Sequence, residues 1–111
     1  MNVTTHRLPE WKPKNGTVWI ALDYDDTYTS APEAFDALVI ALKSHGHRAY
    51  FVTFRSPADF APVCAAADRL GIGAIATDGV PKMKATDDLG ISIDIWIDDM
   101  PEIVLGNGDG F

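Results

Sequence analysis

The chain has 111 residues and a mass of 12.1 kDa, the size of one small domain, which excludes a two-lobed enzyme with its cleft between domains. Nine Lys and Arg against sixteen Asp and Glu give a formal net charge of −7, so strong nonspecific binding to nucleic acid is not expected. The single cysteine excludes an internal disulfide, and no apolar run has the length of a signal peptide or a membrane span. We therefore expect a cytoplasmic protein with no membrane partner.

The N-terminal segment contains two prolines within its first thirteen residues and no apolar periodicity. It predicts an irregular arm over residues 1–16, with Leu8 and Trp11 available to pack on the domain. A single domain is predicted over residues 17–105. The glycine-rich residues 106–111 are predicted to form a flexible tail.

Four short runs rich in β-forming residues predict strands at residues 17–22, 49–53, 74–77 and 91–97. Apolar residues at helical spacing, with proline near the start and glycine after the end, predict helices over about 32–44, from Ser56-Pro57 to Leu70, and from Lys84 to Leu89. This alternation of strands and helices predicts parallel strands joined by right-handed crossovers. The predicted fold class is α/β, a three-layer sandwich with a small, mainly parallel sheet.

Polar side chains gather where the predicted strands end. The first strand ends in Asp23-x-Asp25-Asp26-Thr27, the second in Thr53 and the fourth in Asp98-Asp99, and Lys82 and Lys84 precede or begin the last helix. Because ligands bind beyond the carboxyl ends of parallel strands, we expect these groups at one edge of the sheet. Clustered carboxylates repel one another unless a cation lies among them, and oxygen ligands favour Mg²⁺. With a lysine to complement a phosphate, this set predicts phosphoryl transfer.

The four motifs, in this order, resemble those of the haloacid dehalogenase (HAD) superfamily of phosphohydrolases. That family has an apolar strand ending in DxDxT, a strand ending in Thr or Ser, a lysine, and a strand ending in an acidic pair. Here the resemblance covers residues 17 to about 104. It implies a HAD-like, Rossmannoid fold and a Mg²⁺-dependent phosphatase that works through an aspartyl-phosphate intermediate.

The resemblance also implies a role for each matching residue. Asp23 is implied to be the nucleophile and a Mg²⁺ ligand. Asp25 is implied to be the general acid and then the base, with its backbone carbonyl on the metal. Thr53 is implied to hold the phosphoryl group, and Asp98 to complete the metal shell, with Asp99 bound directly or through water.

Two assignments have alternatives at this point. Lys82 is preferred over Lys84 as the catalytic lysine because Pro81 holds it at a loop leaving the third strand, but both are candidates. Arg55, two residues after Thr53, is either a contact for a substrate phosphate or carboxylate, or a surface arginine at a helix start.

Family members that act on small metabolites usually carry a cap domain inserted after the first motif or the third strand. Only a few residues separate Thr27 from the first helix, or Thr77 from Lys82, so we expect no cap and an open site. Few residues follow Asp99, so the family's fifth strand is expected to be missing or vestigial. The expected partner is a phosphorylated substrate, such as a nucleotide or an exposed phosphate end; no oligomeric state is predicted.

Two other functions are compatible with parts of this pattern. One is a HAD-like module that binds a metal or a phospho-ligand with little turnover and needs a partner to complete its site. The other is a receiver domain of two-component signalling, which needs its phosphorylated aspartate at the end of the third strand. Here that strand ends in Ala76-Thr77-Asp78 and DxDxT lies on the first strand, so the receiver domain is the weaker hypothesis.

Overall fold

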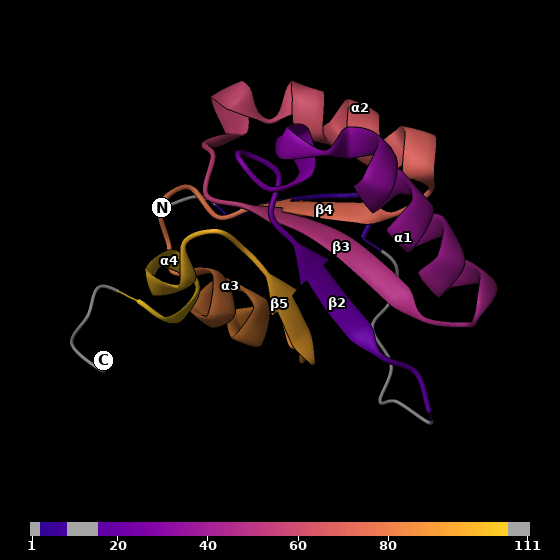
Figure 1. The fold of residues 1–111 in the computed structure, drawn as a ribbon. Helices are drawn as coiled ribbons and strands as arrows, with labels where there is room; N and C mark the ends of the chain where they lie inside the picture. The colour runs from indigo at the N-terminus through magenta and orange to yellow at the C-terminus, as the bar shows by residue number, and fades with distance from the viewer. Residues whose placement is uncertain (1–2, 9–15, 107–111) are drawn as a thin grey trace.

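A mixed sheet with α-helices on both of its faces makes up most of the described chain (Figure 1). The computed structural model describes residues 3–8 and 16–106. Its strands are β1 (Thr4–His6), β2 (Trp19–Leu22), β3 (Arg48–Thr53), β4 (Gly73–Ala76) and β5 (Ile95–Ile97). Its α-helices are α1 (Pro32–Ser44), α2 (Ala61–Leu70), α3 (Lys82–Asp88) and α4 (Pro101–Leu105). Within these ranges, no helix is both long and apolar enough to cross a membrane.

The strands lie in the order β1-β4-β3-β2-β5. Neighbours from β4 to β5 pair in parallel, as predicted, whereas β1 joins the edge of β4 antiparallel. In the register, Leu22 lies opposite Phe51 on one side and opposite Ile97 on the other. The carboxyl ends of β2 and β5 are therefore level, and β3 continues two residues further, to Thr53, at the same edge of the sheet.

The sheet separates two apolar clusters. Helices α1 and α2 cover one face in Figure 1, where Leu22 and Phe51 of the sheet pack with Val39 and Val63. On the other face, Trp19, Tyr50, Val52 and Ile75 pack with the segment that follows α3, including Ile91. Because β2 and β3 are covered on both faces, they are continuous apolar runs rather than alternating ones.

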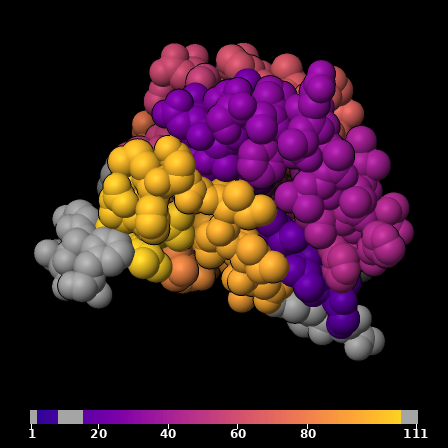
Figure 2. All heavy atoms as spheres, viewed as in Figure 1, coloured from indigo at the N-terminus to yellow at the C-terminus, as the bar shows by residue number. Residues whose placement is uncertain are grey.

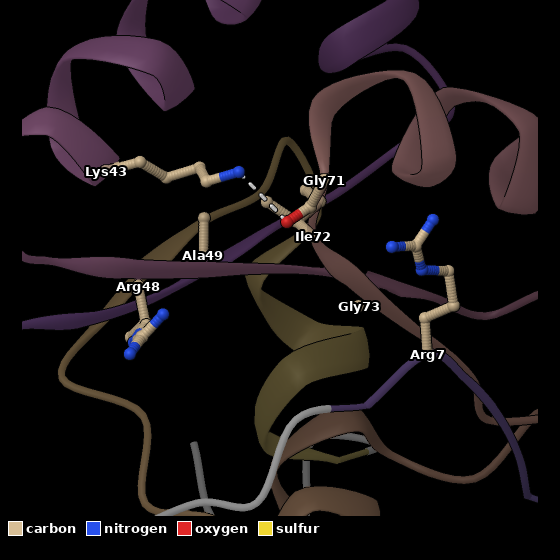
Figure 3. A pocket seen from close by; sticks show the side chains of 7 residues that line it. All are labelled: Arg7, Lys43, Arg48, Ala49, Gly71, Ile72 and Gly73. Atoms are coloured by element: carbon tan, nitrogen blue, oxygen red, sulfur yellow. Dashed lines mark hydrogen bonds between the residues drawn. The ribbon is translucent and has the colours of Figure 1, made fainter.

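A pocket of about 200 Å³ lies at the opposite edge of the sheet, near the amino ends of β3 and β4 (Figure 3). It is lined by Arg7, Lys43, Arg48, Ala49 and the three residues Gly71–Gly73. The Lys43 ammonium there donates to the carbonyl oxygens of Leu70 and Gly71 at 2.9 and 3.0 Å. Gly71 itself ends α2 in a left-handed conformation, with φ of 67°. Lys43 thus satisfies the free carbonyls of a helix C-terminus and ties α1 to α2.

Two predicted elements differ from the structure. The prediction of an irregular arm over residues 1–16 is wrong for Thr4–His6, which form β1 by pairing with β4. The predicted packing residue Leu8 does contact the second apolar cluster, whereas Trp11 lies outside the described residues. The strand predicted over 91–97 is confined to β5, because the Asp94 carboxylate accepts the Trp19 amide hydrogen at 2.8 Å, where a strand would offer a backbone carbonyl.

The last third of the chain is more helical than predicted. Helix α3 begins at Lys82 rather than at Lys84, with Pro81 at its N-cap. Helix α4 was not predicted at all; it begins with Pro101, one residue beyond the acidic pair, and packs against α3. Of the predicted flexible tail, residues 107–111 lie outside the described part of the chain.

Candidate functional site

The predicted site residues come from four elements at the carboxyl edge of the sheet. Asp23 follows β2 and its amide donates to the Ile97 carbonyl of β5 at 2.9 Å, so β2 and β5 stay paired up to the site. Figure 2 shows the orange and yellow atoms of β5 and α4 lying beside the violet atoms of the segment that follows β2. The sheet thus brings the DxDxT segment and the Asp98-Asp99 pair together, as the sequence predicts.

Lys82 is the central cation of this edge. Its side chain is fully buried, and its ammonium lies 2.7 Å from Asp23 Oδ1 and also donates to Asp98 Oδ2. Lys84, the other candidate, is 66% exposed and pairs with Asp88 one helical turn away. Because Lys82 is the first residue of α3, its side chain is held at the sheet edge, whereas Lys84 points to solvent.

Three carboxylates surround the Lys82 ammonium or lie next to it. One oxygen from each of Asp23, Asp98 and Asp99 lies within 4.8 Å of the others. Thr27, the last residue of DxDxT, donates to Asp23 Oδ2 at 2.9 Å and lies 3.3 Å from Asp99 Oδ1. Sequence reasoning gave Thr27 no role of its own, although its place in the motif was the signal. Three carboxylates and one ammonium leave two uncompensated negative charges, which suits one divalent cation bound by oxygen.

The pKa of Asp23 is raised above its usual value, as expected for a buried carboxyl beside other carboxylates. Burial raises the pKa of its carboxyl to about 6, and the hydrogen bond from Lys82 opposes this rise. Asp98 also raises this pKa through its charge. A cation among these oxygens would favour the ionised form of Asp23, the form in which a carboxylate can ligate a metal.

Asp25 and Asp26 do not join the three carboxylates. Arg55 holds Asp25 with two parallel hydrogen bonds, at 2.9 Å from Nε and 2.8 Å from Nη2, and its guanidinium lies 5.3 Å from the centre of the Tyr24 ring. The hydrogen bond from Arg55 lowers the pKa of Asp25 below its usual value. Asp26 is exposed and has a positive φ of 62° within the turn that residues 24–27 form after Asp23. The five strand-end aspartates therefore separate into a cluster of three, an ion pair and an exposed turn.

The Arg55 pair yields a direct test of this electrostatic arrangement. Replacing Arg55 with Met should raise the pKa of Asp25 to its usual value of 3.8 or slightly above, because the guanidinium is lost and partial burial remains. Carbon-detected NMR titration of the Asp25 carboxyl measures this. Arg69→Met is the matched control, because Arg69 pairs with Asp36 instead. An Asp25 pKa that stays low in Arg55→Met would contradict the assigned cause.

Thr53 ends β3 at the same edge, and its hydroxyl accepts the Arg55 amide hydrogen at 3.3 Å. Its carbonyl accepts the amide of Thr77, the residue that follows β4, at 2.9 Å. The Thr77 side chain is fully buried, and its hydroxyl has no hydrogen-bond partner among the described residues. The sequence prediction made Thr77 the last residue of the strand over 74–77 and gave it no role at the site.

Comparisons of this chain with protein families, with curated proteins and with solved structures found no match.

Proposed function

We propose that the protein is a Mg²⁺-dependent phosphomonoester hydrolase that uses Asp23 as its nucleophile. The observation that carries this proposal is the buried Lys82 ammonium between Asp23 and Asp98, with Asp99 and Thr27 completing the cluster. The order of these residues in the chain and their resemblance to the HAD superfamily support the same chemistry.

The cluster offers a cation three carboxylates. Asp23, Asp98 and Asp99 are the residues that would hold Mg²⁺, together with the Asp25 backbone carbonyl that the family resemblance implies. When bound there, Mg²⁺ supplies positive charge beside the phosphoryl oxygens of the substrate. Lys82 then offsets the charge of the nucleophile and of the phosphate from the buried side.

The proposed reaction has two displacements at phosphorus. In the first, a carboxylate oxygen of Asp23 forms a bond to phosphorus while the ester bond to the leaving oxygen breaks, and the leaving oxygen takes a proton from the Asp25 carboxyl. In the second, a water oxygen attacks phosphorus, its proton passes to Asp25, and Asp23 is released as a carboxylate. Thr53 and the Lys82 ammonium stabilise the transferring group.

The ion pair between Asp25 and Arg55 favours a second candidate function. An Asp25 held ionised by Arg55 can accept a proton from water but has none to give to a leaving group. Unless Arg55 releases it when substrate binds, the protein is a module that binds a metal or a phospho-ligand with little turnover and needs a partner to complete its site. Phosphate release and phosphate binding, each measured with Mg²⁺, separate the two functions.

Phosphate release from 4-nitrophenyl phosphate, measured with and without Mg²⁺, tests the proposal. We expect Mg²⁺-dependent turnover that falls about a thousandfold or more in Asp23→Asn. The amide of asparagine cannot attack phosphorus, so neither the formation nor the hydrolysis of the aspartyl-phosphate can take place. Asp88→Asn is the control, an exposed aspartate outside the site. Turnover unchanged in Asp23→Asn would refute the proposal. Mg²⁺-dependent binding of phosphate without any hydrolysis would instead identify the binding module.

A further inference from the structure

A pocket of about 470 Å³ lies next to the candidate site, lined by Phe54, Gly79, Pro81, Glu102, Ile103 and Gly106. This volume is within the range of small-molecule sites in proteins. Phe54 leaves 39% of its surface uncovered by the described residues, which is costly for an aromatic side chain. The pocket is therefore a place where an apolar group gains by binding.

The walls of this pocket are continuous with the site residues. Phe54 directly follows Thr53, and Pro81 directly precedes Lys82. Three backbone hydrogen bonds join the segments that end or follow β3 and β4. The Thr77 amide donates to the Thr53 carbonyl at 2.9 Å, the Asp78 amide to the Arg55 carbonyl at 3.0 Å, and the Gly79 amide to the Phe54 carbonyl at 3.2 Å. A ligand group in the pocket therefore lies against the same backbone that presents Thr53 and Lys82.

Besides the loops after β3 and β4, helix α4 lines the pocket; this helix begins shortly after Asp98-Asp99. The Met100 amide donates to Asp98 Oδ1 at 2.9 Å, which fixes the start of this helix against the carboxylate cluster. Glu102 and Ile103 of α4 then face the loops after β3 and β4 across the pocket. The pocket and the candidate phosphoryl site are thus built from neighbouring residues of the same three segments of the chain.

The lining chemistry selects the kind of group that fits. Phe54, Pro81 and Ile103 offer apolar surface, and the two glycines offer no side chain, so a flat ring can approach the backbone closely. Glu102 is the one charged residue among the described residues of the lining, and it disfavours an anionic group. We propose that this pocket receives a flat, apolar ring in the leaving group of a phosphomonoester substrate, an inference that rests on the proposed hydrolase function.

Two pairs of substrates test this inference; the members of each pair have the same leaving oxygen and differ by the presence of a flat aromatic ring. In the first pair, 2-phenylethyl phosphate is compared with ethyl phosphate; in the second, adenosine 5′-monophosphate is compared with ribose 5-phosphate. We expect kcat/KM to be about tenfold higher for the ring-bearing member, the gain from burying on the order of 60 Å² of ring surface. A preference in the first pair identifies a simple aryl or aralkyl ester, and one confined to the second identifies a nucleotide.

Variants then test whether Phe54 causes the preference for the ring-bearing substrate. In Phe54→Ala the ratio of kcat/KM within the preferred pair should fall close to one. Leu89→Ala is the matched control, because Leu89 is similarly exposed, at 40%, but does not line the pocket, and it should keep the ratio. Equal kcat/KM within both pairs for the unmodified protein would overturn the inference and leave the hydrolase function standing.

A binding measurement keeps the two proposals separable. In Mg²⁺, the midpoint of thermal unfolding is compared with 2-phenylethylphosphonate and with ethylphosphonate, neither of which can be hydrolysed, at the same concentrations. If no ester is hydrolysed but the ring-bearing phosphonate stabilises more, and Phe54→Ala removes the difference, the hydrolase function fails and the ring pocket stands. If neither hydrolysis nor a ring preference is found, both proposals are overturned.

Discussion

Replacing Lys82 with Met should lower the free energy of unfolding by about 3–5 kcal/mol in metal-free buffer at pH 8, the usual effect of removing one partner from a buried ion pair. The Lys82 side chain is fully buried, and its ammonium contacts Asp23 and Asp98. Methionine has nearly the same length but no charge. The variant therefore keeps the packing of α3 against the sheet and leaves three carboxylates without their cation.

Urea unfolding in EDTA measures this loss, and added Mg²⁺ tests its cause. Lys84→Met is the control: Lys84 and Asp88 form an exposed pair one turn apart on α3, so its loss should change stability by no more than about 0.5 kcal/mol. Mg²⁺ should stabilise Lys82→Met more than the unmodified protein, because the cluster then carries three negative charges rather than two. A loss smaller than that of Lys84→Met would show that Lys82 does not hold the cluster together.

The central strands could be predicted from the sequence because burial on both faces makes each of them a continuous apolar run. The segments that became β2 and β3 are buried on both faces, so they are continuous apolar runs that differ clearly from the helices beside them. Parallel pairing then follows from the alternation of strand and helix. This is also why Asp23, Thr53 and Asp98 could be placed at one edge before the structure was known.

The short elements could not be predicted in the same way. Strand β1 spans only Thr4–His6, and it exists because the edge of β4 offers it hydrogen bonds across about seventy residues of chain. Helix α4 has only five residues, Pro101–Leu105, too few to show a periodic apolar face. Such elements are stabilised by tertiary packing, here against β4 and α3, and local sequence carries little of that information.

The position of Asp25 shows the same limit within the site. Two-residue spacing in an extended chain would direct Asp23 and Asp25 to one side, as the roles that the family resemblance implies for both require. The chain instead turns over residues 24–27, and Arg55, thirty residues after Asp25, binds the Asp25 carboxylate. The spacing of DxDxT carries no information about Arg55, which lies in the segment after another strand, β3.

Asp23→Asn should stabilise the metal-free protein while it abolishes turnover. Burial raises the pKa of Asp23 from 3.8 to about 6, so the folded state binds a proton more tightly than the unfolded state does. The stability that this preference supplies is present below pH 4 and is lost as the pH rises through 6. Asparagine has no charge to desolvate, its carbonyl still accepts from Lys82, and its amide can donate to the Thr27 hydroxyl.

The gain in unfolding free energy should therefore be about 2–3 kcal/mol at pH 8 in EDTA and close to zero below pH 4. Urea unfolding at a series of pH values measures this profile, with Asp88→Asn as the exposed control that should follow the unmodified protein. Saturating Mg²⁺ should reverse the order at pH 8, since only an ionised Asp23 offers the cation a third carboxylate. An Asn variant that is less stable than the unmodified protein at pH 8 in EDTA would mean that the Lys82 ion pair, and not burial, dominates at Asp23.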